Sequence, residues 1–531
     1  MLDNIKNKYL LQMIFDNLKK RRKLKILKYN KNFMNRLNIK TEDFQQFKLL
    51  KDINDKLNIY IEDTEQVKLI LNEKKINDKG FDILSKIEFT KLKEIYLSKN
   101  KISNLKLLIQ YQLEKLDLSD NLISDINIFE NDIFSELKEL YLNKNKISEI
   151  KQLENAKFDK LIILDLSGNM FSDFNNLKNL NFHHLKEFYF SNNRFSNIQE
   201  LEKVKFEKLE LLDISDDEIN DINSLENFNF PELKELKLNN NEISNINILE
   251  TVKFKKLEKL FLSHNKIMDI EIFGKVDFKE LKELFLNENI ISDIKELKNV
   301  NFEKLEKLDF SFNKISNIDI FEIVNFKELK MLNLNGNNKI SDIKVLSKAK
   351  FDKLEFLDLG FNQLSNIDIL LNVNFKELKN LNLFRNNKIS SINILQKVNF
   401  EKLEKLDLGF IKISDINALE NVNFEELREL DLYCNNISDI KVLERVKFSK
   451  LEILDLRSNQ ISNIDVLEKV NFKELTELYL RNNKISDIKV LKKIKFKRLK
   501  ILDLSNNEIN QNENSDITLN LKSKIKYLYI F

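Results

Sequence analysis

The hydrophobic positions of this chain recur with a fixed spacing. In the stretch LKELFLNENIISDIKELKNVNFEK (281–304), apolar residues stand at Leu281, Leu284, Leu286, Ile291, Ile294, Leu297, Val300 and Phe302. Leu284 and Leu286 alternate with an outward position, which is the period-two pattern of a short strand. Ile294, Leu297 and Val300 recur at every third residue, which favours a 3₁₀ or single-turn helical segment. Each copy therefore predicts one short strand followed by one helical turn.

An asparagine after the strand marks about eighteen copies, at a step of 24 residues nearly everywhere. The equivalents of Asn289 are Asn100, Asn121, Asn145, Asn169, Asn193, Asn241, Asn265, Asn313, Asn337, Asn362, Asn386, Asn435, Asn459, Asn483 and Asn507, with Asp217 and Ile411 in the two gaps. One copy has too few apolar residues to offset its chain entropy, so the copies must stack in order to fold. The pattern predicts an α/β solenoid over residues 67–531, with a parallel sheet on its concave face and short 3₁₀ or helical turns on its convex face.

The repeated pattern L-x-x-L-x-L-x-x-N-x-I resembles the leucine-rich repeat. Its second half, I-S-x-I-x-x-L-x-x-V-x-F, is similar to the short intracellular repeats of phosphatase-regulating leucine-rich proteins, lengthened by two residues. The resemblance implies that the asparagine turns inward and satisfies backbone groups where the chain leaves the strand. We also expect Phe302 and its counterparts, Phe89 and Phe134 through Phe496, to form an aromatic spine inside the coil.

Residues 1–66 do not fit the repeat and predict a helical N-terminal segment. The stretch 5–39 resembles a degenerate F-box, the helical module that docks a receptor onto the adaptor of a cullin ubiquitin ligase. The residues that carry this resemblance are Leu10, Leu11, Ile14, Phe15, Leu18, Leu24 and Leu27, and the first five of them would dock the adaptor. The alternative is a helical cap that only covers the first repeat. At the other end, residues 508–531 predict a C-terminal cap.

The amino-acid composition indicates which kinds of partner the chain binds and in which cellular compartment it functions. The chain has 88 basic and 85 acidic residues, so its charges nearly cancel, although residues 1–50 alone hold 13 basic and 4 acidic side chains. Mixed charge indicates a solvated surface and argues against nucleic acid as a partner. The lone cysteine excludes an intramolecular disulfide, and no apolar run approaches the length of a membrane span. We expect a monomer without a membrane partner in the cytoplasm, with the nucleus as the alternative.

Reactive side chains do not gather anywhere in the sequence. His183, His184 and His264 lack a further histidine or cysteine at ligand spacing, and Cys434 has no basic neighbour that would lower its pKa. Aspartates occupy the outward strand position in many copies, mostly alternate ones, and duplication of repeat pairs explains them better than catalysis does. The sequence therefore predicts no catalytic residue, no metal ligand and no cofactor.

Aromatic residues enter the outward and post-strand positions from the middle of the chain onward. They are Phe261, Phe285, Phe312, Phe361, Phe384, Phe410 and Tyr433. Exposed aromatic side chains commonly anchor protein interfaces, and burying one Phe contributes roughly 1.5–3 kcal/mol. The alternative is that phenylalanine is simply frequent, since the chain holds 40. We predict a non-catalytic scaffold that binds a protein partner along the concave face. Two narrower uses are a cullin-ligase substrate receptor and a phosphatase regulatory subunit.

Overall fold

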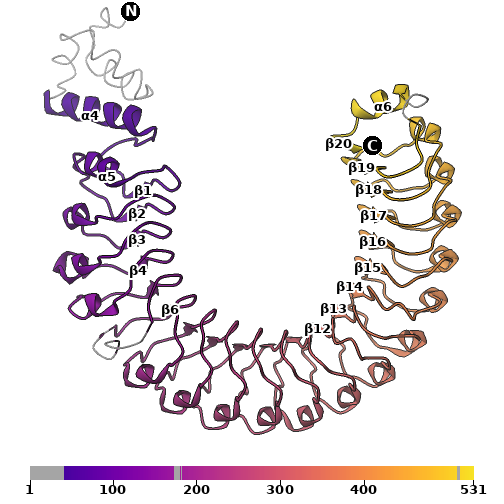
Figure 1. Ribbon diagram of the computed structural model, residues 1–531, viewed down its shortest axis with the longest axis horizontal. Helices are drawn as coiled ribbons and strands as arrows, with labels where there is room; N and C mark the ends of the chain where they lie inside the picture. Colours follow the sequence, from indigo (N-terminus) through magenta and orange to yellow (C-terminus); the bar gives the residue numbers. More distant parts are fainter. Residues whose placement is uncertain (1–40, 173–176, 178–179, 181, 511–514, 531) are drawn as a thin grey trace, which may run out of the picture. The chain divides into compact units, whose positions relative to one another are not determined.

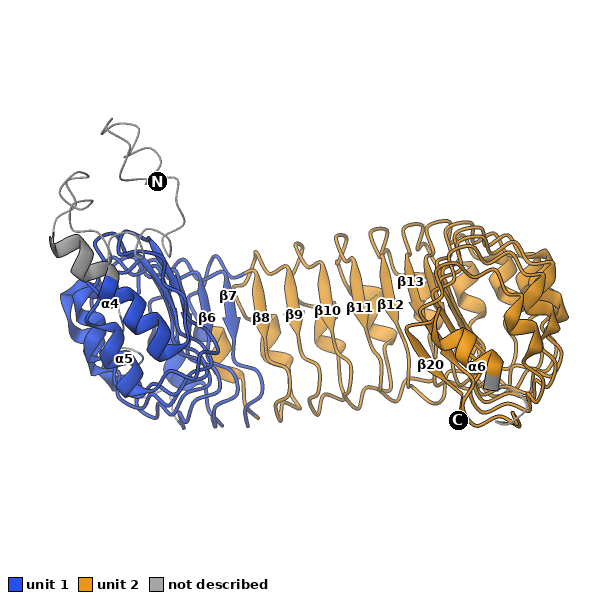
Figure 2. Cartoon of the chain, turned by 90° about the horizontal axis from the view of Figure 1, so that it is seen from above, with its two compact units in different colours: residues 1–219, 227–233 blue, residues 220–226, 234–531 orange. Residues whose placement is uncertain are grey.

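The computed structural model describes residues 41–172, 177, 180, 182–510 and 515–530. These residues form two compact units (Figure 2). Unit 1 comprises the described residues up to Ile219 together with Asn227–Leu233, and unit 2 comprises Asn220–Glu226 and the described residues from Lys234 onward. Each unit is a stack of similar coils (Figure 1).

Unit 1 contains seven parallel strands of three residues each, and consecutive strands pair in register. They are β1 (Lys68–Ile70), β2 (Glu94–Tyr96), β3 (Lys115–Asp117), β4 (Glu139–Tyr141), β5 (Ile163–Asp165), β6 (Glu187–Tyr189) and β7 (Leu211–Asp213). The central residue of every one of these strands is buried, because the period of two turns it away from the outward positions on either side.

Unit 2 continues the same pattern through thirteen strands. They are β8 (Glu235–Lys237), β9 (Lys259–Phe261), β10 (Glu283–Phe285), β11 (Lys307–Asp309), β12 (Met331–Asn333), β13 (Phe356–Asp358), β14 (Asn380–Asn382), β15 (Lys405–Asp407), β16 (Glu429–Asp431), β17 (Ile453–Asp455), β18 (Glu477–Tyr479), β19 (Ile501–Asp503) and β20 (Tyr527–Tyr529). Consecutive strands again pair in parallel, as in the register of Leu284 with Leu308.

Short 3₁₀ segments lie on the opposite side of the coils from the strands in both units (Figure 1). Segment η11 (Lys295–Asn299) is typical, because it buries Leu297 while its charged neighbours remain outside. Leu284 and Leu286, which face it from the strand side, are fully buried. The prediction of a leucine-rich repeat solenoid with a parallel sheet and short 3₁₀ turns is thereby confirmed.

Three described α-helices flank the coils: α4 (Thr41–Leu57), α5 (Asp78–Leu84) and α6 (Ser515–Lys522). Helix α4 buries Leu50 and Ile53, and α6 buries Ile517 and Leu521. These helices cover apolar side chains that an open end of a solenoid would expose to water. No helix within the described residues is both long and apolar enough to cross a bilayer.

The repeated asparagine holds successive coils together. The Nδ2 group of Asn313 donates to the carbonyls of Leu286 at 2.9 Å and Phe310 at 3.1 Å. Its Oδ1 accepts the N–H of Ile291, in the preceding copy, at 3.0 Å. Asn313 is only 6% exposed, so these bonds satisfy backbone groups that water does not reach. The inward orientation predicted for this residue type is confirmed.

The two copies without the asparagine differ in their turns. Asp217 Oδ1 accepts the N–H groups of Asn193 at 2.9 Å and Phe195 at 3.2 Å, but its Oδ2 is buried without a hydrogen-bond partner. Burial raises the pKa of Asp217 to about 7. At the other gap Ile411 is buried in the core, and the next residue, Lys412, adopts a left-handed backbone with φ of 65°.

The aromatic spine is inside the coil for most of its length. Its members from Phe134 to Phe472 are buried, whereas Phe89 and Phe496 at the two ends are half-buried. Ring contacts join Phe158 to Phe182, with centroids 5.7 Å apart, and Phe182 to Phe206, with centroids 6.2 Å apart. These rings are core residues and are not available to a partner.

Candidate functional site

Five of the seven aromatic residues singled out from the sequence come together on the strand side of unit 2. We call them the aromatic cluster: Phe312, Phe361, Phe384, Phe410 and Tyr433. The other two, Phe261 and Phe285, form a separate stacked pair on β9 and β10, with centroids 5.0 Å apart. The sequence prediction treated all seven as one patch, and the structure divides them into a cluster and a pair.

The rings of the cluster form a connected chain. Phe361 meets Phe384 edge to face at 4.9 Å between centroids, and Phe312 lies 6.4 Å from Phe361. Phe384 stacks on Tyr433 at 5.3 Å with 21° between the ring planes. Phe410 contacts both of these rings edge to face. Offset-stacked and edge-to-face contacts are the favourable arrangements of aromatic rings, so the cluster has a defined geometry.

Three members of the cluster stand at a strained backbone position. Phe312, Phe361 and Phe410 follow their strands with φ of 52°, 49° and 58°. A residue with a Cβ loses roughly 1–2 kcal/mol in this left-handed conformation, and a bulky side chain is uncommon there. Other copies place asparagine at the same position, at Asn192, Asn240, Asn482 and Asn506. The turn itself therefore does not require phenylalanine.

Two of the six glycines in the chain make room for these rings. A Cβ on Gly409 would lie 2.7 Å from Cε1 of Tyr433 and 3.0 Å from Cδ2 of Phe384. A Cβ on Gly336 would lie 2.6 Å from Cδ1 of Phe312. Real Cβ atoms do not approach ring carbons so closely, so the ring positions depend on the absence of a side chain at both places.

The cluster is open to solvent at Phe312 and Phe410, which are 50% and 38% exposed. Phe361, Phe384 and Tyr433 are half-buried, because the rings cover one another. Burial also raises the pKa of Tyr433 to about 12, so its hydroxyl is neutral at physiological pH. The cluster thus presents two open phenylalanine rings on a base of packed rings, and it holds no nucleophile or general base.

Two arginines lie among these rings, and the sequence analysis did not single them out. The guanidinium carbon of Arg385 lies 5.0 Å from the ring centroid of Phe361 and 5.6 Å from that of Phe410. Arg457 lies 5.6 Å from the ring of Tyr433, and its Nε donates to both carboxylate oxygens of Asp455 at 2.9 Å. In the sequence, these arginines stand just after the strand, where other copies carry a small or polar residue. The neighbouring copies carry an aromatic residue in this part of the repeat.

Carboxylates form a continuous row on three neighbouring strands beside the cluster. Asp407 pairs in register with Asp431, and Asp431 pairs with Asp455. Burial raises the pKa of Asp407 to about 6 and that of Asp431 to about 7, and the nearby Asp407 carboxylate adds to the rise at Asp431. The sequence analysis emphasised aspartates two copies apart, but these three occupy consecutive copies. They are structural neighbours of the cluster and complete no catalytic arrangement with it.

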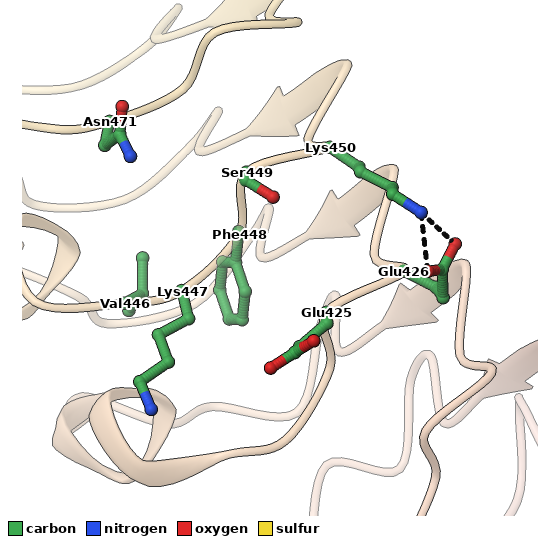
Figure 3. Close-up of a pocket in the computed structure, with 8 residues that line it drawn as sticks. All are labelled: Glu425, Glu426, Val446, Lys447, Phe448, Ser449, Lys450 and Asn471. Atoms are coloured by element: carbon green, nitrogen blue, oxygen red, sulfur yellow. Dashed lines mark hydrogen bonds and ion pairs between the residues drawn. The ribbon is translucent and has the colours of Figure 1, made fainter.

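A shallow pocket of about 450 Å³ lies elsewhere on unit 2, in the segments that lead into β16 and β17 (Figure 3). Val446 and Phe448 form part of its lining. Lys450 Nζ crosses its rim to both carboxylate oxygens of Glu426, at 2.5 and 2.6 Å. This ion pair joins two of the charged residues of the lining, and no residue of the aromatic cluster lines the pocket.

Among the remaining candidates from the sequence, the histidines and the cysteine lie within the described residues. His183 and His184 are exposed, His264 Nε2 lies 2.8 Å from Glu288, and Cys434 is half-buried. The described part of the chain contains no group of three or more His, Cys, Asp or Glu residues placed to hold a metal ion. The predicted adaptor-docking residues Leu10, Leu11, Ile14, Phe15 and Leu18 lie outside the described residues.

Comparison with known proteins agrees with this geometry. The family profile described as Leucine Rich repeats (2 copies) matches residues 231–274, 255–299, 303–348, 425–469 and 473–523. A leucine-rich repeat protein of Leptospira interrogans is 25% identical over 81% of this chain and 99% of its own, with a TM-score of 0.59. The Arabidopsis receptor kinase HAESA, solved with the peptide hormone IDA and a co-receptor, is 22% identical over 83% of this chain and 74% of its own, with a TM-score of 0.56.

No curated protein matches the sequence. The repeat matches and the shared fold show that the chain contains leucine-rich repeats, which confirms the resemblance seen in the sequence. Proteins of this class generally serve as protein-interaction scaffolds.

Proposed function

We propose that this chain is a non-catalytic scaffold that binds a protein partner on the strand side of unit 2, through the aromatic cluster. The observation that carries the proposal is the position of Phe312, Phe361 and Phe410. Each is a bulky residue in a left-handed turn that other copies build with asparagine. Residues that oppose local backbone preference and remain partly exposed are typical of functional surfaces.

The exposed rings of the aromatic cluster contribute more to the binding of a partner than to the stability of the free chain. Phe312 keeps half of its surface in water, so its ring adds little to the stability of the free chain. If a partner covers the exposed parts of Phe312 and Phe410, each ring contributes up to roughly half of the 1.5–3 kcal/mol that full burial of a phenylalanine provides. The packed rings beneath them also reduce the side-chain entropy that association would otherwise remove.

A pull-down from the cells of origin tests the proposal. The test variant replaces Phe312, Phe361 and Phe410 together by asparagine, the residue that other copies carry there. The matched control makes the same change at Phe261 and Phe285, where the copies with Asn333 and Asn382 already carry asparagine. We expect the main partner to be lost from the test variant and kept by the control. If both variants retain the same partners as the native chain, the proposal is wrong.

The identity of the captured partner decides between the two narrower hypotheses. Cullin and adaptor subunits would support a ligase substrate receptor, and these subunits should vanish from a chain that lacks residues 1–50. A phosphatase catalytic subunit, retained without residues 1–50, would support a regulatory subunit. A captured protein of neither kind would make both hypotheses wrong and leave the scaffold proposal in place.

A further inference from the structure

Arg385 is a charged residue held between two rings of the aromatic cluster. It follows β14 in the left-handed conformation, with φ of 56°, and its side chain is exposed. Phe361 and Phe410 occupy the same post-strand position in the copies before and after it. Their ring centroids lie 5.0 and 5.6 Å from the guanidinium carbon. Cation–π contact with two rings stabilises the guanidinium in one place.

The charge of Arg385 is not neutralised within the described part of the chain. Its guanidinium has neither an ion-pair partner nor a hydrogen-bond acceptor there. The carboxylates of the neighbouring strands are otherwise engaged: Asp407 accepts the N–H of Gly409 at 2.8 Å, and Asp358 accepts the side-chain amides of Asn335 and Asn382 at 3.0 Å.

Arg457 provides an internal comparison. It also lies between two rings, at 5.6 Å from Tyr433 and 5.0 Å from Tyr479. Its Nε, however, donates to both oxygens of Asp455, which is buried. An arginine between two aromatic rings therefore occurs twice. Arg457 pairs with a carboxylate inside the fold, whereas Arg385 has no such partner among the described residues.

Resting on the proposed function, we propose that Arg385 is the anion-recognition residue of the aromatic cluster, and that the bound segment of the partner carries an Asp or Glu side chain flanked by apolar residues. The guanidinium is a planar fork of N–H donors that matches a carboxylate in two parallel hydrogen bonds. The two rings cover part of the guanidinium surface and hold its orientation, so little side-chain entropy is lost on pairing. The apolar neighbours of the partner's carboxylate would cover Phe410 and Phe312.

A carboxylate fits this place better than a phosphate does. Phosphate sites commonly gather several cationic groups, whereas the equivalent positions on both sides of Arg385 are phenylalanines. Asp407, on the next strand, has a pKa of about 6 and is therefore mostly ionised at neutral pH, so it adds negative charge to this side of the sheet. A group with two negative charges would meet more repulsion there than a group with one.

The test is a selection of peptides on the full chain. Random twelve-residue peptides are displayed with their C-termini fused to the carrier, so that no terminal carboxylate is free. Peptides that bind the native chain but not the triple asparagine variant of Phe312, Phe361 and Phe410 define the binders of the cluster. We expect these binders to share an Asp or Glu beside aromatic or branched apolar residues.

A synthetic peptide from the selection then measures the role of Arg385. We expect Arg385→Gln to weaken binding at least about tenfold, as should replacing the peptide's acidic residue by its amide. The two changes together should weaken binding no further than either alone, because both remove the same pair. The variant Arg385→Glu should bind a peptide in which Lys replaces the acidic residue. Arg457→Gln, the matched control, should lower the unfolding midpoint while the preference for an acidic peptide remains.

The other possible results contradict the inference, and they also show whether the proposed function fails with it. Cluster-dependent peptides that are neutral or basic, or that bind Arg385→Gln as tightly as the native chain, contradict the role of Arg385 and leave the proposed function standing. A selection without any cluster-dependent peptide contradicts the proposed function and the inference together.

Discussion

At the scale of single residues, the clearest departure from the repeat is Asp217. Every asparagine in the series can donate to backbone carbonyls, but a carboxylate cannot do so while it is ionised. One oxygen of Asp217 is consequently buried without a partner, and burial raises its pKa to about 7. An unsatisfied buried polar group costs about 1–3 kcal/mol.

Replacing Asp217 by asparagine should therefore stabilise the chain. We expect the free energy of unfolding of unit 1 to rise by about 1–3 kcal/mol at pH 8, because the amide can donate where the carboxylate cannot. Urea unfolding followed by circular dichroism measures this change, and Asn313→Asp provides the reverse change at a matched position in unit 2. A lower midpoint for Asp217→Asn would contradict the account of the repeated asparagine.

The same substitution should change the pH dependence of stability. Asp217 titrates near pH 4 in the unfolded chain and at about pH 7 in the folded chain, so the folded chain binds more protons between these values. Its contribution to stability therefore falls as the pH rises from about 4 to 7. The native chain should lose this stability across the window, and Asp217→Asn should lose less. Identical pH profiles for the two proteins would show that Asp217 does not titrate as described.

At the scale of elements, the strand and its turn explain both the fold and the candidate site. The buried leucines and the inward asparagine could be predicted from sequence, because their period and chemistry are the same in each copy. The left-handed turn after the strand could not be predicted from sequence, because the residue at that position varies from lysine to phenylalanine and does not recur with a fixed period. The division of the aromatics also depends on ring packing, in which Gly409 allows Phe384 to stack on Tyr433 across an intervening strand.

Gly409→Ala tests this packing directly. Its added Cβ would lie within contact distance of both rings, so we expect a loss of about 1–3 kcal/mol in the stability of unit 2 and weaker partner binding. In the background of Tyr433→Ala the same substitution should cost less, because the closest ring is gone. Equal costs in the two backgrounds, measured by urea unfolding, would mean that Gly409 does not serve the cluster.

The three post-strand phenylalanines give a second test at this scale. Changing Phe312 to asparagine, the residue found at this turn in other copies, should leave the free energy of unfolding unchanged or raise it by up to roughly 1 kcal/mol, as measured by urea unfolding. The ring is half exposed, so little apolar burial is lost. A marked loss of stability would show that Phe312 is a packing residue, and it would weaken the argument for a binding surface.

At the scale of the whole molecule, the sequence indicated a charge-balanced scaffold, and the described residues show where much of the charge lies. Lysine and glutamate of neighbouring copies pair across the coils, as in Lys330 with Glu306 at 2.8 Å and Lys379 with Glu355 at 2.7 Å. Such exposed pairs contribute at most about 1 kcal/mol each, and each pair brings together one positive and one negative charge. We therefore propose that specific recognition depends on the aromatic cluster and Arg385, where apolar surface and a charge without a partner among the described residues meet.

Photo-cross-linking from the cluster itself tests whether a partner binds there. A benzoyl-phenylalanine introduced in place of Phe312 keeps an aromatic ring at the exposed edge of the cluster, and the same group in place of Lys298, on the 3₁₀ side of unit 2, is the control. In extracts of the cells of origin, we expect one reproducible protein to cross-link at position 312 and not at position 298. If no protein cross-links at position 312, or if the same proteins cross-link at both positions, the partner does not bind at the aromatic cluster and the account is wrong.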